Sequence, residues 1–401
     1  MSDDNTPSNL LTKDTVAAYV TQHASQINVF PPDATLTADA IQGGNVNFAF
    51  VVRSSCGKKS VFVKQAPEYV AIFGPDGLPL TSTRIQKEVA ILKEWTDILG
   101  EEADRYIPKL YYFDDENKVF VMEFLEGFDL LDHHLVGSPT SDVELSLATQ
   151  LGDFMAKTHL ATHSSVVSPE RAAFLTTEYE NRALRDIQLE YVFTKAYEET
   201  SEQTSKGFTV DDAFLAEVNA LKARYNGEGG AGNMTLCHGD LHPGSVMIKA
   251  DDEDTQVRVI DPEFTVYGPP GLDVGSLLSG YVLAAVHQLY ANDDDEKKAE
   301  TVSSITNGVN AGWEKYKSVM SEGGISDELI REIEVESVGF TVAEVCRTAL
   351  GHAGGRLWLQ FDDPEVKEAA IETALSIVTK CMMARHTEGM KVLSESLTAL
   401  L

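Results

Sequence analysis

The sequence predicts an α+β protein of two lobes, in which a small antiparallel sheet with one helix precedes a larger, mainly helical part. Up to about residue 125 the chain alternates short strand-like apolar runs with turns. After Gly127 most segments carry apolar residues at helical spacing, apart from one further pair of strand-like runs. A chain of 401 residues with 43% hydrophobic residues also favours two lobes over one.

The first lobe begins with two β-rich stretches, NFAFVVRS (47–54) and KSVFVKQA (59–66), which the turn SCGK joins into an expected hairpin. Segment 81–99 follows with Ile85, Val89, Leu92 and Ile98 at helical spacing, behind a Thr/Ser N-cap candidate. KLYYFDD and KVFVMEFL, within 109–125, indicate two more strands. We therefore expect an N-terminal lobe at 1–125, a hinge near 123–127 and a C-terminal lobe at 126–401.

The second lobe is expected to be helical at 143–162, 178–200, 210–225, 272–290, 298–320, 326–353 and 364–395. Between 234 and 261, the runs SVMIKA and VRVID flank the turn DDEDTQ and predict a second hairpin. This hairpin comes directly after the tripeptide HGD, so the tripeptide is expected in a loop.

Composition excludes several classes of partner. The 63 Asp and Glu against 32 Lys and Arg give a net charge of −31, so no basic stripe is available for nucleic acid or an anionic membrane surface. The four cysteines lack CxxC spacing and fit reduced core thiols. The polar, acidic N-terminus is unlike a signal peptide, and no run of 18 apolar residues occurs, so we expect a cytoplasmic location.

Three features of the first lobe suggest phosphate binding. In GGNVN (43–47), a glycine-rich turn before a strand lets backbone amides approach a phosphate, and Asn47 could orient it. Gly-Gly-Asn is also an ordinary turn. Lys64 interrupts an apolar strand, where the strand alone favours an outward, solvated side chain. Glu88, on the expected helix, is a plausible ion-pair partner that would direct the Lys64 amine at ligand phosphates.

The strongest pattern is HGD (238–240) followed 21 residues later by DPE (261–263), with a hairpin between them. Phosphoryl transfer needs one carboxylate to orient the attacking hydroxyl and others to hold Mg²⁺ against the nucleotide. Asp240, Asp261 and Glu263 have this spacing. For His238 and His242 we favour a structural role in the loop over metal ligation.

The order of these motifs resembles the kinase-like small-molecule phosphotransferases, and within them the 5-methylthioribose kinase family. The resemblance is carried by GGNVN, VKQA, PLTSTR (79–84), VMEFL (121–125), HGDLHPGS (238–245), VIDPEF..YGPPGLDVG (259–275) and GF...EVCR (339–347). It implies a two-lobed protein-kinase-like fold, a probable homodimer, and transfer of phosphate from ATP, with Mg²⁺, to the anomeric hydroxyl of methylthioribose in methionine salvage.

The resemblance also implies residue roles. Asp240 would be the catalytic carboxylate at the sugar hydroxyl, and Arg347 would bind the sugar. The nucleotide would be contacted by Asn47, Lys64 with Glu88, the backbone of Glu123, Phe124 and Leu125, and Asp261, Pro262 and Glu263. The metal ligands would be Asp261 and Glu263.

The chain departs from the family pattern at two positions. The family has an arginine pair where this chain has Arg347 and Thr348, so one substrate-side cation is missing. Pro243 replaces a threonine and should stiffen the loop. The first departure leaves open a kinase for another small alcohol, such as an aminoglycoside, choline or homoserine. A non-catalytic nucleotide-binding protein is the other alternative, although such proteins commonly lack one of the carboxylates or the lysine.

Overall fold

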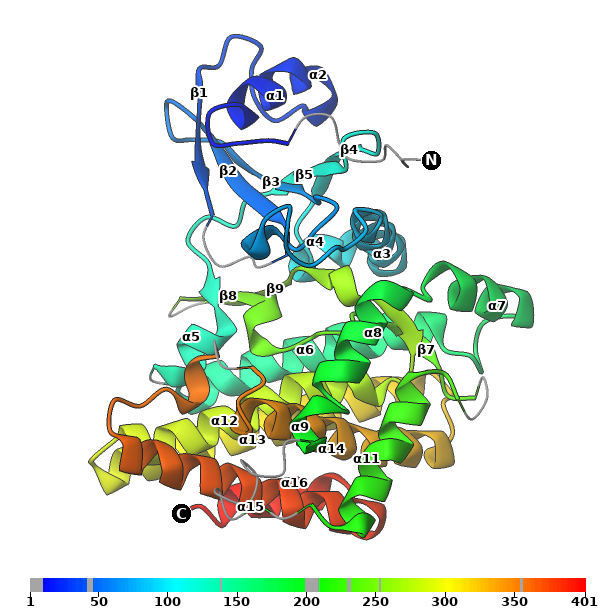
Figure 1. The fold of residues 1–401 in the computed structure, drawn as a ribbon, viewed down its shortest axis with the longest axis vertical. Coiled ribbons are helices and arrows are strands. Elements are labelled where there is room, and N and C mark those ends of the chain that lie inside the picture. Colours follow the sequence, from blue (N-terminus) through cyan, green and yellow to red (C-terminus); the bar gives the residue numbers. More distant parts are fainter. Residues whose placement is uncertain are drawn as a thin grey trace. The chain divides into compact units, whose positions relative to one another are not determined.

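The structure is a computed structural model that describes residues 10–41, 46–137, 139–198, 208, 210–228, 232–251, 254–353 and 356–401. The chain divides into two compact units, Met1–Phe128 and Asp129–Leu401. A sheet dominates the first unit and helices dominate the second (Figure 1). This arrangement confirms the predicted α+β class, with an N-terminal antiparallel sheet followed by a mainly helical part.

The first unit is built on a five-stranded antiparallel sheet in the order β1-β2-β3-β5-β4. Both predicted strand pairs are present, and the sheet gains an additional edge strand, β1. The elements are α1 (Val16–Gln22), α2 (Ala24–Ile27), β1 (Leu36–Ala40), β2 (Phe48–Ser54), β3 (Ser60–Gln65), η1 (Ala71–Phe73), α3 (Arg84–Leu99), η2 (Gly100–Glu102), α4 (Ala103–Tyr106), β4 (Leu110–Asp114) and β5 (Val119–Glu123).

Helices cover both faces of this sheet, whereas the sequence predicted one helix. Alternate residues of β3 and β5, such as Val61, Val63 and Val121, pack with Val16 and Val20 of α1. The intervening residues belong to the opposite face, because side chains alternate along a strand. That second face packs on α3 through Phe62, Phe120, Met122, Ile85 and Val89. Lys64 has the same parity as Phe62 and therefore lies on the α3 face.

The second unit contains a helical core with two small sheets, β6-β8-β9 and β7-β10. Its first elements are β6 (Asp129–Leu130), α5 (Leu131–Val136), α6 (Ser141–Thr162), α7 (Pro169–Glu178), α8 (Arg182–Tyr191), α9 (Lys195–Glu198) and α11 (Asp212–Tyr225). The strands and short turns follow as β7 (Thr235–Cys237), η3 (Pro243–Ser245), β8 (Val246–Asp251), β9 (Asp254–Val259), η4 (Pro262–Phe264) and β10 (Val266–Gly268). The last elements are α12 (Gly271–Ala291), α13 (Asp295–Glu322), α14 (Asp327–Ala349), η5 (Leu357–Leu359), α15 (Pro364–Glu388) and α16 (Met390–Thr398).

Helix α12 is the centre of the second unit. Every residue of its first sixteen, 271–286, is buried, as expected for a helix that is apolar on all sides. It packs against α13, α14 and α15, and these helices gather around it in Figure 1. No helix in the described part of the chain has the length and apolar character needed to cross a bilayer.

Four local predictions were wrong. Segment 178–200, expected to be helical, contains the two helices α8 and α9 with a turn between them. The expected helix 364–395 is two helices, since Gly389 adopts a positive φ of 60° between α15 and α16. Thr83 precedes α3 but makes no side-chain capping hydrogen bond. Of the four free cysteines, Cys56 is exposed and the other three are buried, so Cys56 is not a core thiol.

Candidate active site

In the first unit, Lys64 and Glu88 form a buried ion pair. The Lys64 ammonium lies 2.9 and 2.8 Å from the two carboxylate oxygens of Glu88. Their side chains are only 7% and 2% exposed. The pairing inferred from the sequence is therefore present, but the outward, solvated Lys64 that the strand alone favoured is wrong. Strand alternation turns Lys64 toward α3, where Glu88 compensates for the cost of burying the ammonium.

Asn47 is held by an arginine that the sequence reasoning did not single out. Its side-chain oxygen accepts a hydrogen bond of 3.0 Å from Nε of Arg84. Arg84, the last residue of PLTSTR, is buried and also donates to the carbonyls of Val46, Pro67 and Leu80. Arg84 thus fixes the start of β2 to the start of α3. Gly43 and Gly44 lie outside the described residues, so the glycine turn is not seen.

The segment expected to bind adenine begins at the end of β5. The Glu123 amide donates to Lys109 O at 2.8 Å, and the guanidinium of Arg53 lies 4.8 Å from the centroid of the Phe124 ring. Among the described residues, the Leu125 amide donates no hydrogen bond. An unsatisfied backbone donor beside a strand end is a group that a planar heterocycle can engage.

In the second unit, Asp240 lies in the loop between β7 and η3. Gly239 before it has a φ of 87°, and a Cβ there would stand 2.0 Å from the Phe264 carbonyl oxygen, so only glycine fits. The Ser245 hydroxyl donates to Asp240 O at 2.9 Å. The Oδ1 atom of Asp240 is buried and has no hydrogen-bond partner within the described structure. A buried, unpaired carboxylate oxygen is costly, so it calls for a partner such as a water, an ion or a ligand.

The two histidines of the loop are structural, as expected. His238 Nδ1 accepts from the Asp240 amide at 3.2 Å, and its Nε2 donates to Ile260 O at 2.9 Å. His242 Nδ1 accepts from the Gly244 amide at 3.0 Å, which leaves its Nε2 on the side of Asp240, 3.7 Å from Oδ2. Burial, with the charges of Arg356 and Arg347, holds the pKa of His242 well below its ordinary value.

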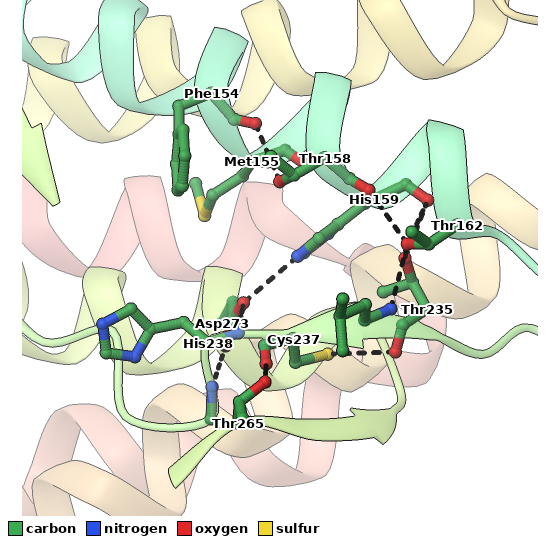
Figure 2. Close-up of polar contacts among 12 residues, drawn as sticks. Phe154, Met155, Thr158, His159, Thr162, Thr235, Cys237, His238, Thr265 and Asp273 are labelled. Atoms are coloured by element: carbon green, nitrogen blue, oxygen red, sulfur yellow. Dashed lines mark hydrogen bonds and ion pairs between the residues drawn. The ribbon is translucent and has the colours of Figure 1, made fainter. Parts of the chain in front are cut away.

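Asp273, on the first turn of α12, holds the loop through hydrogen bonds. It was not among the predicted site residues. Its carboxylate accepts from the amides of His238 at 2.7 Å and Gly239 at 2.9 Å, and from His159 Nε2 at 3.2 Å. Figure 2 shows Asp273 between His159 of α6 and the backbone of His238. The string YGPPGLDVG contains Asp273, but nothing in the string shows that it contacts HGD.

The DPE motif forms the turn after β9. Asp261 has a left-handed backbone, with φ 61° and ψ 47°, and precedes Pro262 of η4. Asp261 is exposed and Glu263 is buried, and a carboxylate oxygen of one lies within 4.8 Å of an oxygen of the other. Two carboxylates at this separation fit Mg²⁺, which prefers a few carboxylate oxygens together with phosphate oxygens and water.

Arg347 lies in the last turn of α14, where its Nη2 is 2.9 Å from Glu344 Oε2. The same oxygen accepts from Arg356 Nη1 at 3.2 Å. Glu344 belongs to the string EVCR but was not predicted as a site residue. Arg356 was not predicted either, because nothing in its spacing links it to the motifs. Thr348 is buried and donates to the Glu344 carbonyl at 3.1 Å, within its own helix.

The fold and the loop carboxylates define a class of kinase-like phosphotransferases, and comparison with known families agrees. Residues 57–300 match the model of the phosphotransferase enzyme family. This match covers more than half of the chain, so the chain belongs to that family. Such an enzyme takes a nucleotide and a small-molecule acceptor.

Several individual proteins are similar to this chain. The chain is 27% identical over 385 residues to a methylthioribose kinase of Geobacillus sp. (strain WCH70), covering 91% of this chain and 90% of that protein. It is 29% identical over 370 residues to a methylthioribose kinase of Exiguobacterium sibiricum, covering 88% and 89%. Among solved structures, an ethanolamine kinase of Plasmodium vivax is similar with a TM-score of 0.47 and 12% identity, covering 92% of this chain and 90% of the other.

Proposed function

We propose that this enzyme transfers the γ-phosphoryl group of ATP to the anomeric C1 hydroxyl of 5-methylthioribose, giving 5-methylthioribose 1-phosphate in methionine salvage. The observation that carries the proposal is the unpaired, buried Oδ1 of Asp240, on a loop fixed by Asp273 and His238. The choice of sugar is supported by similarity to methylthioribose kinases along nearly the full length of the chain.

Asp240 orients the acceptor hydroxyl and takes up its proton as the new oxygen–phosphorus bond forms and the bond to the leaving ADP oxygen breaks. The transition state of such transfers is loose, so the enzyme contributes position and charge more than covalent chemistry. Asp273 accepts hydrogen bonds from the amides of His238 and Gly239, and His238 Nδ1 accepts one from the Asp240 amide. These bonds hold the loop backbone up to Asp240 and so limit the motion of its carboxylate before reaction.

In the first unit, the Lys64 ammonium, oriented by Glu88, and the Asn47 side chain would contact the nucleotide phosphates. The backbone of Glu123, Phe124 and Leu125 would contact the adenine. Asp261 and Glu263 would hold Mg²⁺, with Pro262 beside the nucleotide. When bound, the metal neutralises charge on the nucleotide phosphates.

A substrate panel with ATP tests the proposal. Turnover is measured for methylthioribose, choline, homoserine and an aminoglycoside, with Asp240→Asn as the inactive control. Turnover on methylthioribose at a kcat/KM far above that of the other acceptors is expected. Brisk turnover of an aminoglycoside alongside failure on methylthioribose overturns the choice of sugar, and failure on all acceptors despite nucleotide binding favours a non-catalytic binding protein.

We also propose a homodimer, on the family resemblance alone. Light scattering of the purified protein tests it, and a mass of one chain at micromolar concentration contradicts it.

A further inference from the structure

The second unit contains an arginine, Arg356, that contacts the same carboxylate as Arg347 but does not occupy the second position of the family's arginine pair. Thr348 occupies the position of the second family arginine, but its side chain is only 8% exposed and is bonded to its own helix. A hydroxyl in that state offers no positive charge to a ligand. Any second substrate-side cation must therefore come from elsewhere.

Arg356, at the residue before η5, places a second guanidinium beside that of Arg347. Its guanidinium donates to Glu344 Oε2 at 3.2 Å, and Arg347 lies 2.9 Å from the same oxygen. The Arg356, Arg347 and Glu344 side chains are 15%, 13% and 8% exposed. Two largely buried guanidinium groups thus share a single carboxylate oxygen.

The segment that carries Arg356 lies near the catalytic loop, because η5, directly after Arg356, packs against α5, and α5 packs against η3, which follows Asp240. Burial lowers the pKa of Arg356, and the neighbouring charge of Arg347 lowers it further, while the carboxylates of Glu344 and Asp240 act in the opposite direction. The charges of both arginines also act on His242, two residues after Asp240. Burial raises the pKa of the Asp132 carboxyl on α5, and the charge of Arg356 lowers it. Asp132 Oδ2 also lies 3.2 Å from the place a Cβ on Gly244 would take, so α5 brings it to the catalytic loop. Arg356 and Arg347 therefore lie near the loop that carries Asp240.

The unsatisfied groups in this region fit a hydroxylated ligand. Each guanidinium has five N–H donors, and the buried Arg347 Nε has no acceptor in the described structure. Asp240 Oδ1 is the matching unsatisfied acceptor. Adjacent sugar hydroxyls both accept and donate hydrogen bonds, so they satisfy both kinds of group. An ammonium group has no lone pair for the guanidinium donors and meets two like charges there.

We propose that Arg356 is a substrate-positioning and specificity-determining residue, which acts with Arg347 to bind the hydroxyls of a neutral, polyhydroxylated acceptor beside Asp240 and to disfavour cationic acceptors. The proposal deepens the proposed function and rests on it for the identity of the sugar. In this proposal, Arg356 supplies the positive charge that is missing at position 348, eight residues earlier in the chain.

The test compares Arg356→Met and Arg356→Lys with wild type, using methylthioribose, choline and an aminoglycoside as acceptors. For Arg356→Met we expect KM for methylthioribose to rise roughly 10- to 100-fold, with kcat changed less and KM for ATP unchanged, because a charge-assisted hydrogen bond to substrate is lost. Arg356→Lys, which keeps the charge but loses the guanidinium fork, should be intermediate. Arg105→Met removes an exposed arginine that pairs with Glu102 in the first unit, and should behave as wild type.

The outcomes separate the two proposals. If wild type uses methylthioribose but Arg356→Met keeps its KM within twofold, the role of Arg356 is wrong and the proposed function stands. If wild type uses another neutral polyol and Arg356→Met raises that KM, the role stands and the sugar is wrong. Preferential turnover of choline by wild type overturns both. If Arg356→Met is unfolded by circular dichroism, Arg356→Lys decides: an unchanged KM for acceptor contradicts the proposal and a selective rise supports it.

Discussion

Asp273 accepts the backbone amide of Gly239 at 2.9 Å across 34 residues of sequence. Its other oxygen accepts the amide of His238. Asp273 stands on α12, whose first sixteen residues are all buried, so the loop that carries Asp240 is attached to the core of that unit. This contact connects the core of the second unit to the chemistry proposed for it.

Replacing Asp273 should reduce the free energy of unfolding at pH 7 and make that free energy less sensitive to a fall in pH. Burial opposes ionisation, but the hydrogen bond and charge of His159, with His238 and the Gly239 amide, hold the pKa of Asp273 below its ordinary value of 3.8. Because the folded-state pKa is the lower one, the stabilisation is complete above about pH 4 and is lost as pH falls through the folded pKa. Asp273→Asn should cost about 2–3 kcal/mol at pH 7, since an amide NH₂ would face a backbone donor.

Urea denaturation from pH 7 to pH 3 measures this effect. Wild type should lose stability at the acid end more steeply than Asp273→Asn. Equal acid slopes for the two proteins would show that Asp273 is not responsible for the loss.

Asp240→Asn should reduce kcat by about 10²–10⁴-fold, because the amide cannot accept the proton of the acceptor hydroxyl. Nucleotide affinity should be largely kept, since Asp240 is proposed to act on the acceptor. Steady-state kinetics and calorimetric titration with a non-hydrolysable ATP analogue measure both quantities. A near-normal kcat would refute the role of Asp240.

Lys64→Met should destabilise the first unit by about 3–5 kcal/mol, because it leaves the Glu88 carboxylate buried without its partner. The double variant Lys64→Met/Glu88→Gln should recover much of that stability, since a neutral amide is cheaper to bury. Its turnover should stay low, because the charge proposed to act on phosphates is still absent. Recovery of both stability and turnover in the double variant would mean that the pair is only structural.

Asp261→Asn should weaken the response to Mg²⁺ while keeping the fold. Asparagine tolerates the left-handed backbone that residue 261 adopts, so the turn should survive. The Mg²⁺ concentration for half-maximal activity should rise roughly 10- to 100-fold, as expected when a carboxylate ligand is lost. Thermal melting with Mg²⁺ and ADP provides a second readout, and an Mg²⁺ response equal to that of wild type contradicts the assignment.

Much of the architecture follows from local sequence patterns. The β-rich apolar runs at 48–54 and 60–65 and the helical spacing at 84–99 are local signals, and the structure has strands and a helix there. The additional helices α1 and α2 were missed because their segments are short and their apolar face is narrow. The expected helix 364–395 is divided at Gly389. The prediction missed this break because the positive φ of Gly389 leaves no trace in the spacing of apolar residues.

The sequence by itself determined the fold class and the HGD and DPE loops, since each depends on residue type at short range or on a specific string, and it suggested Glu88 as the partner of Lys64. The tertiary structure decided which face Lys64 occupies, which residue anchors HGD and where a second arginine joins Arg347. The physical reason is that Asp273 and Arg356 act through contacts made by packing of separate helices and turns. Their hydrogen bonds to Gly239 and Glu344 exist only once α12, α14 and η5 are assembled.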